Sequence, residues 1–138
     1  MKGSALLLMV TLFATALPAR AARLDGTQWK MRFRSARSWL HIWKGDTLSF
    51  ESGHFKSDEC GSYGFHDAAY AAKRHDGSEV WTSTLYNADG ERTDWQGVLE
   101  GDRMKGTFTW SKPDGQTRTY KFSAKLASEP APTVSREP

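Results

Sequence analysis

The sequence predicts an all-β fold, a single eight-stranded antiparallel up-and-down (meander) barrel. Apolar and polar residues alternate with period two in many short runs, which is typical of half-buried strands, and turn residues such as Asp-Gly close most of these runs. No segment after the N-terminal region has a helical period long enough to supply the crossover of a parallel sheet. Closure into a barrel is favoured over an open sheet because it removes both exposed edges.

The alternation predicts the strands one by one. In the first, residues 26–34, Trp29, Met31 and Phe33 point to one side and basic residues to the other. The next three are expected around Leu48 and Phe50, around Phe55, and at residues 69–74. The second half repeats the pattern more clearly, with strands at 79–86, 93–100, 104–110 and 119–126.

Residues 1–21 have the three parts of a secretory signal peptide: a basic start at Lys2, an apolar run from Ala5 to Leu17, and small residues before a cleavage site near Ala21. The apolar run is shorter than the roughly 20 residues that a membrane-spanning helix needs. We therefore expect a secreted or periplasmic protein with no transmembrane segment in its mature chain. Residues 22–126 form the expected barrel domain, and residues 127–138, rich in Pro, Ser and Glu, an expected disordered tail.

Charge and cysteine content narrow the class of protein. Without Lys2 and Arg20 the chain carries 17 basic and 16 acidic residues, so its net charge predicts no nucleic-acid partner. Cys60 is the only cysteine, which excludes an intramolecular disulfide and leaves the core to be held by burial. We interpret Cys60 as a packed thiol; pairing with another molecule or a reactive thiol remain alternatives.

Two short motifs resemble those of a known class of barrels. The opening strand carries Leu24-Asp25-Gly26-Thr27-Gln28-Trp29, with Gly shortly before Trp, and Gly101-Asp102-Arg103-Met104-Lys105-Gly106-Thr107 forms a turn into a strand with an inward glycine. Both resemble lipocalins and related calycin barrels, over residues 24–126. Two residues separate Gly from Trp here, whereas the lipocalin signature has one, and no arginine stands near Lys125 at the end of the last strand. The resemblance implies a lipocalin-like barrel and assigns no ligand.

Inward aromatic residues suggest a ligand site. A pocket for a small hydrophobic molecule needs apolar walls with a few polar groups, although the same rings can simply fill the barrel. Both interpretations stay open. The candidate wall residues are Tyr70, Trp81, Trp95, Phe108, Trp110 and Phe122.

The segment 35–45 is unusually apolar for a connection, since it contains Trp39, Leu40, Ile42 and Trp43. Trp39 and Trp43 are candidate ligand contacts at the barrel mouth if the segment forms a lid. A plug across the barrel end or an extension of the flanking strands are the alternatives.

Closure would also gather basic residues on one outer face, since the last strand would lie between the first and the seventh. The residues concerned are Lys30, Arg32, Arg34, Arg103, Lys105, Lys121 and Lys125. Such a face can attract an anionic component of the cell envelope or an acidic protein. A solvated strand surface is the alternative.

We expect no enzyme activity, cofactor or metal. The four histidines do not fall at metal-ligand spacing, and no nucleophile-elbow or zinc-protease motif occurs. The polar run 57–67 contains Cys60, His66 and carboxylates, but such residues also collect in loops at a barrel rim without chemistry. The predicted function is binding of a small hydrophobic or amphipathic ligand inside the barrel. The alternative is a protein-interaction or inhibitor-type barrel with a filled interior that acts through its outer surface or rim at the cell envelope.

Overall fold

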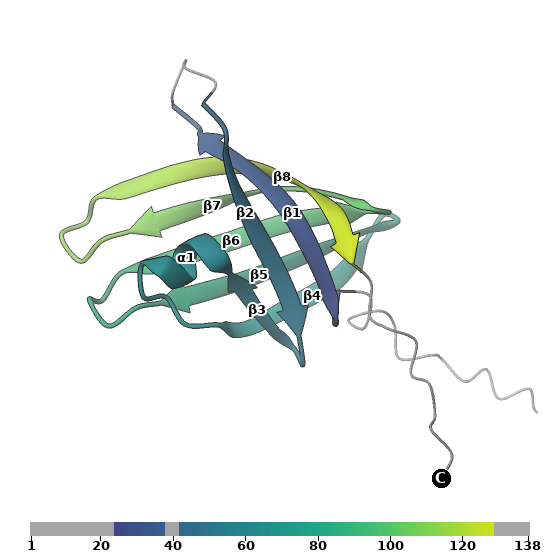
Figure 1. The fold of residues 1–138 in the computed structure, drawn as a ribbon, viewed down its shortest axis with the longest axis horizontal. Helices are drawn as coiled ribbons and strands as arrows, with labels where there is room; N and C mark the ends of the chain where they lie inside the picture. Colours follow the sequence, from purple (N-terminus) through teal and green to yellow (C-terminus); the bar gives the residue numbers. More distant parts are fainter. Residues whose placement is uncertain (1–23, 38–41, 129–138) are drawn as a thin grey trace, which may run out of the picture.

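The computed structural model describes residues 24–37 and 42–128, and shows a closed barrel of eight antiparallel strands in up-and-down order. The predicted fold class is therefore confirmed, and the barrel is compatible with the lipocalin-like arrangement. The elements are β1 (Thr27–Ser35), β2 (Lys44–Glu51), β3 (His54–Ser57), α1 (Asp58–Ser62), β4 (Ala68–His75), β5 (Ser78–Tyr86), β6 (Arg92–Glu100), β7 (Arg103–Ser111) and β8 (Thr117–Ser128) (Figure 1). Pairing of β8 with β1 closes the sheet.

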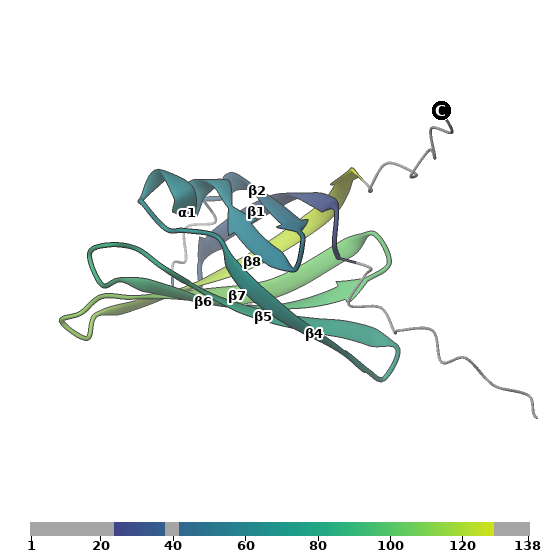
Figure 2. The same ribbon diagram turned by 90° about the horizontal axis from the view of Figure 1, so that it is seen from below.

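The barrel has two unlike ends. At the α1 end lie α1, the end of β1, the start of β2 and the β5–β6 and β7–β8 turns; Figure 2 shows α1 over this end, away from the β4–β5 turn. At the opposite end, which we call the closed end, the fully buried Leu24 lies just before the start of β1. There, Asp25 accepts hydrogen bonds from the Tyr70 hydroxyl at 2.7 Å and from the Gly53 amide at 2.9 Å.

Alternation along each strand puts large side chains inside, as the period of two requires. The buried core consists mainly of Trp29, Met31, Phe33, Leu48, Phe50, Phe55, Trp81, Leu85, Trp95, Leu99, Met104, Phe108 and Phe122. Trp81 is fully buried and lies 4.9 Å from Phe50 and 4.8 Å from Phe55, between ring centroids. The middle and the closed end of the barrel are therefore filled by packed rings.

Two glycines make room for these rings. Gly97 of β6 and Gly106 of β7 are register partners, and Trp81 of β5 is the partner of Gly97 on its other side. A Cβ at Gly97 would collide with the Trp81 indole, and one at Gly106 would lie 2.7 Å from the Phe122 ring and collide with the strand backbone. The absence of side chains at this pair thus allows the bulky rings to cross the interior.

Three local features differ from the sequence-based expectations or extend them. The run 57–67, expected as a rim loop, begins with the short helix α1, because the Ser57 hydroxyl caps it by accepting from the Cys60 amide at 3.1 Å. β2 begins at Lys44, so the end of the apolar segment 35–45 extends a strand, while Trp39 lies outside the described residues. β8 continues to Ser128, two residues past the expected barrel end. The signal-peptide prediction and the rest of the predicted tail fall outside the described residues.

Candidate functional site

A cavity of about 270 Å³ lies at the α1 end of the barrel. We call it the α1-end pocket. Residues of β1, β2, β6, β7, β8 and the α1 region line it, so it sits where the strand ends and the helix meet. Its lining consists of Phe33, Arg34, Ser35, Ile42, Lys44, Asp46, Ser57, Glu59, Cys60, Tyr63, Phe65, Thr93, Phe108, Trp110, Arg118 and Tyr120.

Three aromatic rings in mutual contact form one apolar side of the pocket. Phe108 is stacked on Tyr120 at 4.8 Å and meets Phe33 edge-on at 5.5 Å, between ring centroids. Phe33 and Phe108 are buried, whereas Tyr120 is partly exposed. These rings contact the filled interior on one side and the cavity on the other, and aromatic surfaces of this kind are typical of small-molecule sites.

Trp110 forms a second apolar surface of the pocket and is held in place by contacts with three residues. Its indole N–H donates to Glu91 at 2.5 Å, and its ring lies 5.3 Å from Tyr63 and 6.0 Å from Phe65. The last two residues follow α1, so the helix and its connection to β4 bring aromatic side chains to this side of the pocket.

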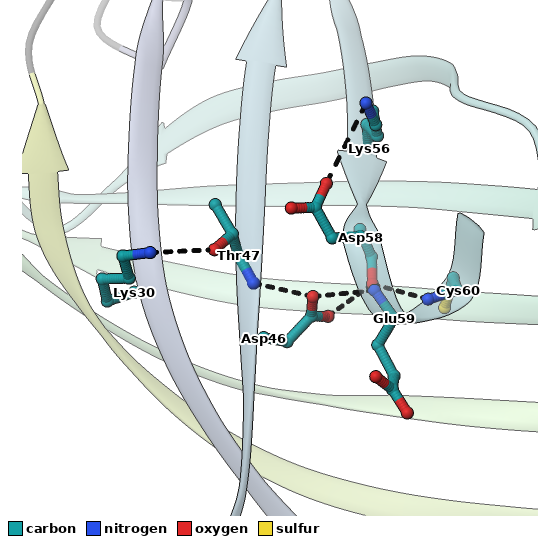
Figure 3. A network of polar contacts seen from close by, with 8 residues as sticks. Lys30, Asp46, Thr47, Lys56, Asp58, Glu59 and Cys60 are labelled. Carbon is teal, nitrogen blue, oxygen red and sulfur yellow. Dashed lines mark hydrogen bonds and ion pairs between the residues drawn. The ribbon is translucent and has the colours of Figure 1, made fainter. Parts of the chain in front are cut away.

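Asp46 attaches α1 to the barrel wall. Its carboxylate accepts from the Ser57 hydroxyl at 2.5 Å, from the Glu59 amide at 2.9 Å and from the Thr47 amide at 2.7 Å (Figure 3). Burial raises the pKa of Asp46, against the lowering effect of these hydrogen bonds. The carboxylate is thus occupied in fixing the start of α1, which forms part of the pocket lining.

Cys60 lines the pocket as a buried thiol. It is 7% exposed, and its sulfur lies 3.9 Å from the Thr93 hydroxyl. Burial raises the pKa of the thiol to about 11, and the nearby carboxylates of Asp46 and Glu59 add to this shift. A thiol with this pKa is protonated at neutral pH and is a poor nucleophile.

Three basic side chains lie at the pocket: Arg34 from the end of β1, Lys44 from the start of β2, and Arg118 from the start of β8. The Arg34 Nε atom is buried and has no hydrogen-bond partner among the described residues. Buried polar groups in proteins are normally hydrogen-bonded. The pocket therefore combines apolar surfaces with cationic side chains, one of which has a buried N–H group without a hydrogen-bond partner among the described residues.

The seven described candidate ligand residues lie in four different places. Phe108 and Trp110 line the α1-end pocket. Trp81, Trp95 and Phe122 lie in the packed interior, each no more than 3% exposed.

The other two described candidates lie away from the pocket. Tyr70 is at the closed end, where burial and its hydrogen bond to Asp25 raise its pKa. Trp43 is 40% exposed and packs under the guanidinium groups of Arg32 and Arg34, at 5.1 and 5.4 Å from its ring centroid.

The predicted ligand contacts do not include several pocket residues, chiefly Phe33, Tyr120, Thr93 and Arg118. Phe33 and Tyr120 could have been found, since both continue the inward alternation toward strand ends that meet at α1. Thr93 could not, because its role depends on the buried hydrogen bond from the Trp95 indole at 3.0 Å.

The predicted basic residues are neighbours on the outer face of β7, β8 and β1. Lys125 is the register partner of both Lys30 and Arg103, and Lys121 is the partner of Arg34. Arg32 and Lys105 both pair with Ser123, from opposite sides.

No group of three or more metal-ligating side chains occurs within residues 24–37 and 42–128. Within the same ranges no helix has the length and apolar character to cross a membrane. No protein-family model, curated protein or solved structure matches the chain.

Proposed function

We propose that this protein binds a small amphipathic molecule in the α1-end pocket, and that it does so as a secreted or periplasmic carrier or sensor without catalysing a reaction. The observation that carries the proposal is the difference in packing between the middle of the barrel and its α1 end. The interior is packed with aromatic rings at its centre, yet a cavity of about 270 Å³ remains beside three of them. Folding alone gives no reason to keep this space unfilled, since close packing stabilises the core.

The chemistry of the lining supports an amphipathic ligand. Phe33, Phe108 and Tyr120 offer aromatic surface for an apolar ring or short alkyl group. Arg34 and Arg118 offer donors for a polar or anionic head group. The volume lies just below the roughly 300–1,000 Å³ of drug-sized sites, so the enclosed part of the ligand must be small.

The experiment is a titration with 1-anilinonaphthalene-8-sulfonate, which carries aromatic rings and an anionic group, followed by the emission of the dye and by calorimetry. We expect saturable binding of one molecule. Tyr120→Trp enlarges a side chain that lines the cavity and should weaken binding at least about tenfold.

Tyr86→Trp is the matched control, because Tyr86 is 58% exposed at the same barrel end and does not line the pocket. It should leave the affinity unchanged. Absence of saturable binding, or equal affinity of the two variants, would contradict the proposal. It would favour the second candidate, a protein-interaction or inhibitor-type barrel that acts through its outer surface.

A further inference from the structure

The outer face of β7, β8 and β1 carries basic residues and no acidic ones. These three strands are hydrogen-bonded neighbours, and none contains an aspartate or glutamate. We call their outward basic residues the basic face: Lys30, Arg32, Arg34, Arg103, Lys105, Lys121 and Lys125. All except Arg34 are exposed.

Among the residues that the structure describes, the cations of this face make almost no ion pairs. Arg103 lies 3.8 Å from Asp102 in the adjoining turn, and this is the one ion pair that a residue of the basic face makes within the described residues. Because like charges on adjacent strands repel, such a grouping does not favour folding. All acidic residues of the described chain lie on other strands, α1 or turns. A nearly neutral domain thus has one strongly cationic side, which orients it in the field of a negative surface.

Exposed apolar side chains adjoin one corner of the basic face. Trp43 is 40% exposed and lies against Arg32 and Arg34. Its neighbour Ile42 also lines the α1-end pocket, but with 66% of its surface exposed. Aromatic rings flanked by cations suit the boundary between lipid head groups and acyl chains, where the ring is half in apolar surroundings and the cations meet phosphate.

We propose that the basic face docks the barrel on an anionic lipid bilayer, with Trp43 and Ile42 entering the head-group region. Charge alone would fit any polyanion. An indole can stack on a sugar ring as well as enter a bilayer, so the choice rests on Ile42: a hydrated acidic polysaccharide offers an exposed aliphatic side chain little apolar surface, whereas a bilayer offers acyl chains. This inference does not depend on ligand binding in the α1-end pocket.

The test is cosedimentation of the purified protein with vesicles of phosphatidylglycerol and phosphatidylcholine mixed, and of phosphatidylcholine alone, at low and moderate salt. We expect binding to the anionic vesicles alone, weakening as salt screens the charges. The triple variant Lys105→Gln/Lys121→Gln/Lys125→Gln should bind at least about tenfold more weakly. Trp43→Gln should also weaken binding to anionic vesicles.

Two control variants test whether a loss of vesicle binding is specific to the basic face. Lys56→Gln/Lys73→Gln/Arg74→Gln removes the same charge from β3 and β4 and should leave vesicle binding within about twofold. Tyr86→Gln removes an exposed aromatic residue outside the basic face and should do the same. Equal retention on both vesicle types, or equal losses in the two triple variants, would overturn the proposal. Binding to soluble heparin without binding to vesicles would overturn it in favour of an acidic polysaccharide.

Discussion

Gly97→Ala should destabilise the barrel, because the added methyl group has no space beside Trp81. A Cβ at Gly97 would lie 2.6 Å from the indole Cε2 atom and nearer still to Nε1. Trp81 cannot move aside easily, since it is fully buried and its ring contacts Phe50 and Phe55. Overpacking of this kind costs about 1–3 kcal/mol, while alanine gains about 0.5–1 kcal/mol over glycine in a strand. The net loss of unfolding free energy is therefore on the order of 1 kcal/mol, with an upper limit of about 2.5 kcal/mol.

The assay is urea unfolding of four proteins: the wild type, Gly97→Ala, Trp81→Phe and the double variant. Trp81→Phe removes the indole Nε1 and Cζ2 atoms that the new methyl group would meet. It also removes a buried N–H that has no hydrogen-bond partner within the part of the chain that the structure describes. In that background Gly97→Ala should cost little, which gives a coupling energy of at least about 1 kcal/mol.

Gly45→Ala is the matched control for a glycine in a strand. The nearest atom to its added Cβ is the Met31 carbonyl oxygen at 3.9 Å, so it should be neutral or slightly stabilising. Additivity of the two core substitutions within about 0.5 kcal/mol would refute the reasoning. So would an equal loss of stability in Gly45→Ala.

Three further outcomes are expected. Asp46→Ala removes the acceptor for three hydrogen bonds and should lower the unfolding free energy by about 2 kcal/mol in urea melts, whereas the exposed Asp58→Ala should stay within about 0.5 kcal/mol. Thr93→Val leaves the buried Trp95 indole N–H without its acceptor and should cost about 1–3 kcal/mol; an unchanged urea midpoint would contradict this. Because burial raises the pKa of Cys60 from 9.0 to about 11, the folded chain keeps a proton that the unfolded chain releases, so stability should fall between about pH 9 and 11, by at most about 3 kcal/mol. Urea melts of the wild type and Cys60→Ala across this range check it, and parallel pH dependence of the two would rule it out.

The pocket was harder to predict than the strands. Trp95 and Trp110 stand on neighbouring strands and both were expected to point inward. One is 2% exposed in the packed interior, and the other lines the cavity. Their sequence patterns are alike, and what separates them is depth along the barrel axis. That depth depends on the stagger between strands, which is a property of the closed sheet.

The alternation of residues in the sequence also could not predict α1, the helix that covers the pocket. α1 has five residues, too few to show a helical period, and it is held by Asp46 from β2, eleven residues before Ser57. Burial of Cys60 follows from that attachment, because α1 carries the thiol toward Thr93 on β6.

By itself the sequence determined the fold class, the number of strands and the inward or outward direction of most side chains. Alternation is local: each residue's side follows from its neighbours along the strand, whatever the strand pairs with. Tertiary structure alone decided which inward rings fill the barrel and which border a cavity, how α1 closes over one end, and that Arg34 has a buried atom with no partner among the residues that the structure describes. These depend on contacts between residues far apart in the chain, whose distances are set only when β8 pairs with β1 and the barrel closes.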